Sequence, residues 1–339
     1  MNILVLGGTR FSGRAFTEHA VRNGHDVTLL HRSAEDPGIA GITRRLVGSR
    51  DPNEGDGLAQ LESLIASGQT FDAVVDMCGF VPRVVRASCE LLAPVAGRYL
   101  FVSSVSVYRI TADGAPDENA PVIELDDPTT EEINSAEAYG GLKALCEDEV
   151  RRAFGDQRSC IVRPGLIVGP NDPTDRFTWW TRVLRTESAV PVPEPGGAAT
   201  FIDARDLAAF YLHCLEHDHA GVYNAAGPSE RLTLPDFARQ AHAALQSETE
   251  LVAAPEPWLL EQDVQPWRDI PVWLAEDSQS LHRASNARAL DHGLRLRPLA
   301  DTARDTAAWD TQRQSPELTA GLDPARIASL VAMRDTARQ

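Results

Sequence analysis

A tyrosine and a lysine four positions apart, Tyr139 and Lys143, have the types and spacing best suited to acid–base chemistry in this sequence. They lie in the stretch 138–143, which opens a predicted helix that continues through Ala144–Ala153. On a helix this spacing places both side chains on one face, with about 6 Å between their β-carbons. A free phenol has a pKa of about 10, and a nearby ammonium lowers it towards neutrality. Tyr139 could then exchange a proton with a substrate oxygen. The alternative is a surface tyrosine beside a solvated lysine.

The chain begins with a glycine-rich turn between a strand and a helix. Ile3–Leu6 is a short apolar run, typical of a strand buried on both faces of a parallel sheet. From Phe11 to Asn23-Gly24 the apolar spacing is helical, and Asp26–Leu30 is a second strand. Such a turn aims backbone amides and a helix N-terminus at a phosphate, which predicts dinucleotide binding rather than a merely tight turn. The expected contacts are Gly7, Gly8, Thr9, Arg10, Phe11, Ser12 and Gly13.

The end of the second strand bears on the choice of cofactor. His31, Arg32 and Ser33 stand where an acid would bind the ribose 2′-hydroxyl of NAD, and no acid is there. Arg32, with its two neighbours and Arg10, could instead accept a 2′-phosphate. NADP(H) is therefore favoured over NAD(H), with a solvated strand-end arginine as the alternative.

The elements that must position these residues alternate along the chain. Further strands are predicted at Ile42–Val47, Asp72–Met77, Arg98–Ser103, Cys160–Arg163 and Gly221–Ala225, with helices at Leu58–Ala66 and Pro82–Leu92 between them. The alternation predicts an α/β fold, a Rossmann-type doubly wound parallel sheet with a small C-terminal substrate-binding cap. The nucleotide-binding domain is expected over 1–170, with a return to the sheet at about 198–228, and the cap over 171–197 and 229–339.

Two regions outside that alternation are candidates for substrate contact. The polar loop 110–137 is expected near the active-site mouth rather than as a spacer. The segment 171–180 mixes polar and aromatic residues, and residues 250–300 carry Trp258, Trp267 and Trp273. These aromatic side chains either line the substrate pocket or fill a small second core.

Composition narrows the class of protein. The 339 residues carry a formal charge of −17, with 43% hydrophobic and 24% charged residues, as in an ordinary globular protein. The negative charge disfavours nucleic-acid binding, which needs clustered Lys and Arg. No signal peptide or membrane span is expected, and the five cysteines, widely spaced, are expected as reduced thiols without a metal site in a cytoplasmic protein. The expected partner is a small-molecule substrate, with a homodimer as an option.

These motifs together resemble the extended short-chain dehydrogenase/reductases, also called the NAD-dependent epimerase/dehydratase family, from Met1 to about Gly227. The resemblance includes Ser104 in Phe-Val-Ser-Ser-Val at a strand end, and departs from the family at Arg10, where a middle glycine is usual. It implies that Ser104 hydrogen-bonds the reacting oxygen, that Tyr139 is the acid–base and that Lys143 holds the ribose hydroxyls. It also implies cofactor contacts at Met77, Cys78, Gly79, Ser103, Tyr139, Lys143, Pro164 and Leu166. Ser49 is a further expected cofactor residue, and it departs from the family pattern because relatives often carry there an Asp that contacts adenine.

Departures from the family's patterns indicate the type of member. Sugar-nucleotide epimerases usually bind the diphosphate with an Asn where Leu166 stands and with an Arg where Ala199 stands. Dehydratases carry an Asp-Glu pair where this chain has Val105 and Ser106. What remains is an NAD(P)-dependent oxidoreductase, here expected as a reductase for a small carbonyl or alcohol. The alternatives are an epimerase with retained NAD, and a non-catalytic RNA-associated relative, because the Gly-Gly-Thr-Arg-Phe turn also resembles chloroplast stem-loop-binding proteins.

Overall fold

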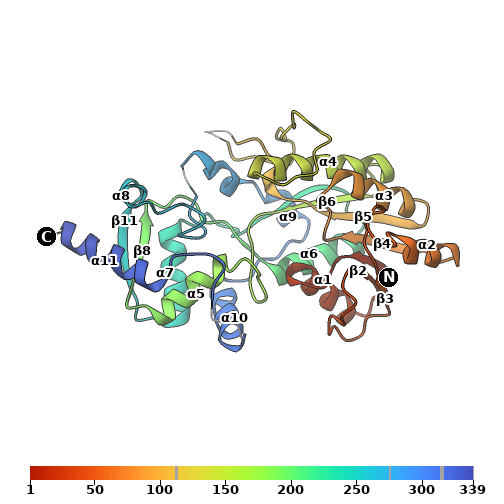
Figure 1. The fold of residues 1–339 in the computed structure, drawn as a ribbon. Coiled ribbons are helices and arrows are strands. Elements are labelled where there is room, and N and C mark those ends of the chain that lie inside the picture. Colours follow the sequence, from red (N-terminus) through yellow and green to blue (C-terminus); the bar gives the residue numbers. More distant parts are fainter. Residues whose placement is uncertain (111–113, 275, 314–316, 339) are drawn as a thin grey trace.

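A computed structural model describes residues 1–110, 114–274, 276–313 and 317–338. Its centre is a parallel sheet of seven strands in the order β10-β6-β5-β4-β1-β2-β3 (Figure 1). The strands are β1 (Asn2–Leu6), β2 (Asp26–His31), β3 (Arg44–Val47), β4 (Phe71–Asp76), β5 (Ala96–Val102), β6 (Ser159–Pro164) and β10 (Gly221–Ala225). The strand order reverses between β1 and β4, the place where open α/β sheets bind ligands. The predicted Rossmann-type sheet is confirmed.

The first strand shows why the sheet must be covered on both faces. Ile3 and Val5 pack into the core on one face, whereas Leu4 and Leu6 pack into the core on the other. Successive side chains of a strand point to opposite faces, so a continuous apolar run needs helices on both sides. Helices α1 (Phe11–Arg22) and α6 (Ala204–Glu216) pack together on the first face. The second face carries α2 (Ala59–Ala66), α3 (Pro82–Leu92) and α4 (Ala136–Phe154).

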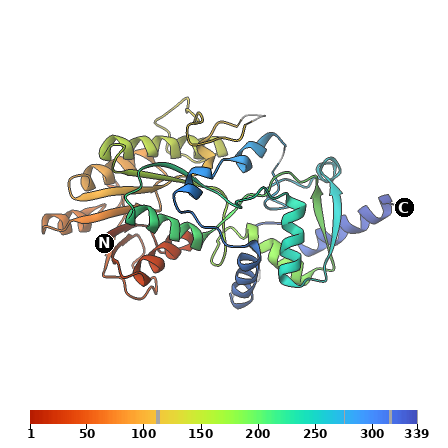
Figure 2. The same cartoon turned by 180° about the vertical axis from the view of Figure 1, so that it is seen from behind.

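A second body lies beside the sheet, with its own apolar core (Figure 2). It pairs strand β8 (Ala189–Glu194) with β11 (Glu250–Pro255). Its helices are α5 (Arg176–Thr186), α7 (Leu234–Leu245), α8 (Glu256–Glu261), α10 (Leu299–Gln312) and α11 (Pro324–Arg338). Phe177, Trp180 and Trp273 are fully buried in this core. These three aromatic residues therefore fill a second core and do not line a substrate pocket. The domain limits given above stay a prediction.

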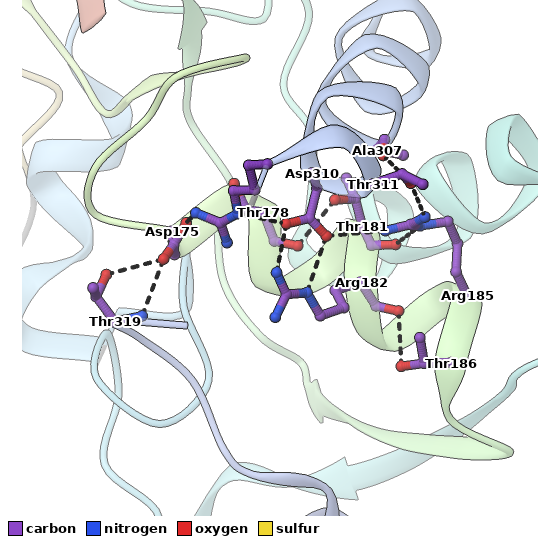
Figure 3. A network of polar contacts seen from close by, with 11 residues as sticks. Asp175, Thr178, Thr181, Arg182, Arg185, Thr186, Ala307, Asp310, Thr311 and Thr319 are labelled. Atoms are coloured by element: carbon purple, nitrogen blue, oxygen red, sulfur yellow. Dashed lines mark hydrogen bonds and ion pairs between the residues drawn. The ribbon is translucent and has the colours of Figure 1, made fainter. Parts of the chain in front are cut away.

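An ion-pair network joins helices α5 and α10 of this second body (Figure 3). Asp310 on α10 accepts hydrogen bonds from Arg182 and Arg185 on α5 and from Arg313. Arg313 also donates to Asp175, at 2.7 Å, just before α5. Burial alone would raise the pKa of Asp310, but its ion pairs with Arg182 and Arg313 more than offset this and hold the pKa below its ordinary value.

The polar loop ends where the helix with the candidate acid begins. Helix α4 starts at Ala136, two residues before the predicted start, because the Ser135 hydroxyl accepts a hydrogen bond from the Ala138 amide and caps the helix. Ile123 and Leu125 of the loop lie against Gly140 and Gly141, directly after Tyr139. The loop therefore packs on the helix that carries the candidate acid; its residues 111–113 lie outside the described part of the chain.

Several shorter elements complete the fold. They are the strand pair β7 (Ile167–Val168) and β9 (Ile202–Asp203), the 3₁₀ helices η1 (Val105–Val107) and η2 (Glu276–Arg283), and helix α9 (Ala287–Asp291). Within the described ranges no helix is both long and apolar enough to cross a bilayer. All five cysteines are described and unpaired; Cys89, Cys146, Cys160 and Cys214 are buried.

Candidate active site

The glycine turn after β1 has no room for side chains. Gly7 and Gly8 have φ values of +92° and +79°, which L-residues with side chains rarely adopt. A Cβ on Gly8 would come within 2.6 Å of Val5, and one on Gly13 within 2.8 Å of the Gly8 Cα. The Thr17 hydroxyl donates to the Gly8 carbonyl at 2.9 Å and holds the turn against α1. Such a cradle suits a phosphate approaching the backbone.

The N-terminus of α1 continues this cradle. Arg10 is the N-cap residue; its side chain is exposed and caps no amide of the helix. Phe11 has a φ of 41°, which is unusual for a residue with a side chain. The first turn of α1 contains no acidic residue, so the positive end of the helix dipole is not offset there. The arginine and the free amides together suit the two negative charges of a pyrophosphate.

An open cleft of about 640 Å³ lies at the carboxyl ends of β1, β2, β3 and β4. This is within the usual range for a small-molecule or cofactor site. Twelve of the expected cofactor residues line it, namely Gly7, Gly8, Thr9, Arg10, Ser12, Gly13, His31, Arg32, Ser33, Ser49, Met77 and Cys78. The expected contacts Phe11, Gly79, Ser103, Tyr139, Lys143, Pro164 and Leu166 are not among the lining residues. Apart from Phe11, these lie at or just beyond the carboxyl ends of β4, β5 and β6 and on α4.

His31 and Arg32 differ sharply in their surroundings. His31 is 6% exposed, and neither of its ring nitrogens has a hydrogen-bond partner in the described structure. Burial, and then the charge of Arg45, lower the pKa of His31, so the ring is neutral at pH 7. Arg32 is exposed beside it at the mouth of the cleft. A buried, unpartnered imidazole beside a free guanidinium fits a bound polar group such as a ribose phosphate.

Sequence reasoning missed a buried ion pair under this cleft. Arg50 donates to Asp76 at 2.5 Å, and the Tyr99 hydroxyl donates to the other Asp76 oxygen at 2.8 Å. Burial alone would lower the pKa of Arg50, but the Asp76 carboxylate more than offsets this and raises it. Asp76 also accepts from the Cys78 amide, so the pair fixes the loop after β4. The sequence did offer one signal, because Asp76 is an acid at the end of an apolar strand. Its partner Arg50 lies 26 residues away and could not be identified from the sequence.

Ser49 next to that pair is held within its own loop. Its hydroxyl donates to Glu54 at 2.8 Å and accepts from the Asp51 amide at 3.0 Å. Asp51 in turn binds Arg83, which holds the pKa of its carboxyl at about 2. The loop at the far end of the cleft is therefore fixed by side-chain contacts of its own.

The structure brings Ser104, Tyr139 and Lys143 together at the carboxyl ends of β4 and β5. Ser104 follows β5, and its hydroxyl accepts from the Ser106 amide at 3.1 Å. The Tyr139 phenol, from α4, lies beside Ser104, which acts to lower its pKa. Lys143, one turn further along α4, donates to the carbonyls of Gly79 and Val102 at 2.6 Å. The phenol and the ammonium thus lie on one helix face next to the loop after β4.

The acidity of Tyr139 differs from the expectation drawn from the spacing. Burial raises the pKa of the phenol, and the hydrogen bond from Ser104 opposes this only in part. The Lys143 side chain is buried, donates to two backbone carbonyls, and has a pKa that burial lowers. With the ammonium directed at the backbone, Tyr139 keeps its proton at neutral pH.

A second buried network supports the neighbouring strands. Ser103 donates to Glu147 at 2.5 Å, and Arg163 forms a two-bond ion pair with the same carboxylate. Arg163 also donates to the Tyr108 hydroxyl at 2.8 Å. Ser103 is thus a structural link between β5 and α4 in this structure. Pro164 and Leu166 lie directly after Arg163, where the chain leaves the sheet.

The sequence of this chain is similar to those of known proteins. The model of the NAD dependent epimerase/dehydratase family matches residues 3–226. A chloroplast stem-loop binding protein of 41 kDa, form b, from Arabidopsis thaliana is 27% identical over 242 residues, which cover 66% of this chain and 58% of that protein. The human epimerase family protein SDR39U1 is 27% identical over 270 residues, or 72% of this chain and 80% of the relative.

Solved structures share the fold. Human SDR39U1, isoform 2, solved with NADPH, has a TM-score of 0.61 at 22% identity and covers 91% of this chain and 99% of its own. The enzyme WbmG of Bordetella bronchiseptica, solved with NAD and UDP, has a TM-score of 0.66 at 16% identity and covers 92% and 95%. At these identities the likeness concerns the fold.

Proposed function

Because the chain belongs to the NAD-dependent epimerase/dehydratase family, we propose that it is an NAD(P)-dependent oxidoreductase that interconverts a carbonyl and an alcohol on a small molecule. The observation that carries this proposal is the placement of the Tyr139 phenol, which lies beside Ser104 and one helical turn from Lys143. All three residues lie at the carboxyl ends of the strands, where the glycine turn also lies. A dinucleotide held in the cleft would supply the hydride.

Each residue has a distinct part in the proposed mechanism. Tyr139 carries its proton at neutral pH, because burial raises its pKa, and so suits donation to an oxygen that becomes negatively charged. The Ser104 hydroxyl, beside the phenol, would orient the same substrate oxygen. Lys143, whose ammonium donates to the Gly79 and Val102 carbonyls, has a third N–H that would bind the ribose hydroxyls of the cofactor. A protonated phenol favours the reductive direction.

Cofactor choice is a separate part of the proposal. The exposed Arg32, the exposed Arg10 and the unpartnered His31 favour a 2′-phosphate, and hence NADP(H). The human relative solved with NADPH agrees with this preference. NAD(H) remains the alternative, in line with the structural neighbour solved with NAD.

A sugar-nucleotide epimerase is the second candidate function, favoured by the fold shared with WbmG, which was solved with NAD and UDP. Leu166 and Ala199, in place of the usual diphosphate ligands, oppose it. An epimerase retains and recycles its cofactor, whereas a reductase exchanges it on every turnover. Cofactor that stays bound through gel filtration and is reoxidised within one turnover would favour the epimerase.

RNA association is the non-catalytic alternative, favoured by the name of the Arabidopsis relative. The charge of −17 opposes it, because RNA binding depends on clustered basic residues. Binding to RNA that weakens steeply between 50 and 200 mM salt, in a protein without turnover, would favour this alternative.

The test of the main proposal is Tyr139→Phe. The variant keeps the ring and loses the proton, so turnover of NADPH or NADH over a panel of carbonyl compounds is expected to fall by about 10²–10⁴-fold. Cofactor affinity, measured by titration calorimetry, is expected to stay within about twofold. Unchanged turnover in the variant would discard Tyr139 as the acid.

A further inference from the structure

Arg176, the first residue of α5, has an unusual environment. Its side chain is half-buried, yet it forms no hydrogen bond or ion pair within the described residues. The guanidinium lies over the ring of Trp267, 5.0 Å from the ring centre. Its nitrogens are not among the fully buried atoms without a partner, so at least part of the guanidinium is accessible to solvent. An arginine has five N–H donors, and leaving all of them without a protein partner while half-burying the charge is costly.

Trp267 connects Arg176 to a histidine with a free acceptor. The ring centres of Trp267 and His282 lie 6.0 Å apart. The His282 Nδ1 lies 2.7 Å from the Ala198 carbonyl, so Nδ1 carries the hydrogen and Nε2 keeps its lone pair. Burial lowers the pKa of His282 to about 4, which leaves the ring neutral at pH 7. A donor fork, an aromatic platform and a neutral acceptor therefore lie side by side.

Asp172 adds a buried acceptor near the arginine. It is fully buried; one oxygen accepts from the Thr174 amide and hydroxyl, and the other, Oδ2, has no partner in the described part of the chain. Burial raises the pKa of Asp172 to about 6, against the effect of the two bonds from Thr174 and the charge of Arg176. The carboxylate offsets part of the guanidinium charge, so the pair would favour a single oxyanion over a polyanion.

These groups lie next to the region where the chemistry is expected. The Thr200 hydroxyl donates to the His282 carbonyl at 2.6 Å. A Cβ on Gly165, which directly follows Pro164 at the end of β6, would lie 3.8 Å from the Thr200 side chain. The contacts therefore run from the carboxyl end of β6 through Thr200 and His282 to Trp267 and Arg176. They connect the carboxyl end of β6 to the part of the second body that carries Arg176.

We propose that Arg176, Trp267 and His282 form the substrate-recognition site, and that Arg176 binds the single oxyanion of a small hydroxylated substrate. This inference rests on the proposed function. An arginine fork binds a carboxylate or a phosphate through two bonds. Trp267 offers a face for the carbon skeleton, and Nε2 of His282 accepts from a hydroxyl group. Because Leu166 and Ala199 replace two diphosphate ligands, one guanidinium here suits one anionic group.

The test uses three matched aldehyde sugars as probes: D-glucose, D-glucuronate and D-glucose 6-phosphate. Each is titrated into the cofactor-loaded full chain by calorimetry. At least one of the two anionic probes is expected to bind at least tenfold more tightly than glucose. The carboxylate and the phosphate arms identify which oxyanion the site prefers.

Variants of Arg176 test whether this residue causes the preference for the anionic probes. Arg176→Gln is expected to remove the tenfold preference, and Arg176→Lys, which keeps the charge and loses the fork, to retain only part of it. Arg231→Gln removes the same charge from an exposed position of the second body and is expected to change nothing. Equal binding of all three probes, no binding of either anion, or a preference that survives Arg176→Gln would overturn the inference.

The two proposals fail separately in this design. Cofactor titration of the unchanged chain and turnover of Tyr139→Phe test the oxidoreductase proposal, and neither depends on Arg176. If cofactor binds and turnover requires Tyr139, but anions are not preferred, only the recognition site is wrong. Thermal unfolding of Arg176→Gln within a few degrees of the unchanged chain shows that the loss is not one of folding.

Discussion

Arg32 shows how a single exposed side chain can decide cofactor selectivity. It stands at the mouth of the cleft, beside a histidine whose ring nitrogens have no partner among the described residues. Charge-assisted hydrogen bonds contribute about 1.5–3 kcal/mol, so removing one weakens binding by roughly 10- to 100-fold. Arg32→Ala is therefore expected to weaken NADPH binding by about that factor and to leave NADH binding nearly unchanged. Titration calorimetry with both cofactors measures this, with Arg231→Ala as control. Equal losses for the two cofactors would count against a 2′-phosphate contact.

At this scale, the sequence predicts residues whose partners are local better than residues whose partners are distant. The Tyr139–Lys143 spacing is a property of one helix, and both side chains are found on one face of α4. The Arg50–Asp76 pair is not local, because Arg50 lies in the loop after β3 and Asp76 is the last residue of β4. A buried arginine and an exposed one look alike in sequence. The free guanidinium of Arg176 escaped prediction for the same reason.

The ion pairs between α5 and α10 allow a prediction at the scale of elements. Asp310 is the shared acceptor of Arg182, Arg185 and Arg313, and its side chain is 2% exposed (Figure 3). Removing one member of a buried ion pair leaves the other charges uncompensated and costs about 3 kcal/mol or more. Asp310→Ala is expected to lower the free energy of unfolding by about that amount in urea titrations. Asp301→Ala, on the exposed first turn of α10, is the control and should cost less than about 1 kcal/mol.

The segment η2 allows a prediction of pH dependence. Its His282 has a pKa lowered to about 4 by burial, against 6.5 for the ordinary side chain. Above pH 6.5 the ring is neutral in both the folded and the unfolded chain. Between pH 6.5 and 4 only the unfolded chain takes up the proton. The free energy of unfolding therefore decreases as the pH is lowered through this range, by up to about 3 kcal/mol. His282→Asn is expected to remove this part of the loss in urea titrations at pH 7 and pH 5.

A matched histidine separates that effect from general acid sensitivity. His242 on α7 lies in the same body, and His242→Asn is expected to keep the acid loss of the unchanged chain. If His282→Asn and the unchanged chain lose the same stability between pH 7 and pH 5, the ring of His282 is not the group that titrates.

Elements were predictable from sequence to different degrees. The central strands of the sheet, such as β1 and β4, are mostly apolar runs that need cover on both faces, and each strand of the sheet was predicted to within a few residues. Strand β8 was not predicted, because Pro191 and Pro193 cannot donate to a strand ladder. Strand β8 forms because β11 is its only strand partner in the described structure, and this pairing needs no N–H donor at Pro191 or Pro193. Such a strand is visible only once its pairing is known.

At the scale of the whole molecule, the second body is fastened to the sheet at the start of α6. Asp203 caps that helix and accepts from Arg205 and from Thr302 on α10. Three residues on, Asp206 accepts from the amide and the side chain of Arg297, just before α10. The chain crosses between the two bodies at several points (Figure 1). Their relative position is therefore set by buried carboxylates as well as by apolar contact.

The sheet is also completed out of chain order, which matters while the protein is being made. Strand β6 ends at Pro164, and its outer neighbour β10 begins only at Gly221. Until the ribosome has added those roughly 60 residues, at about 5–20 residues per second, β6 is an uncovered edge strand for about 3–12 seconds. An uncovered edge is a template for strands of other chains. The nascent protein is thus most prone to aggregation during that interval of translation, while the nucleotide-binding half is nearly finished.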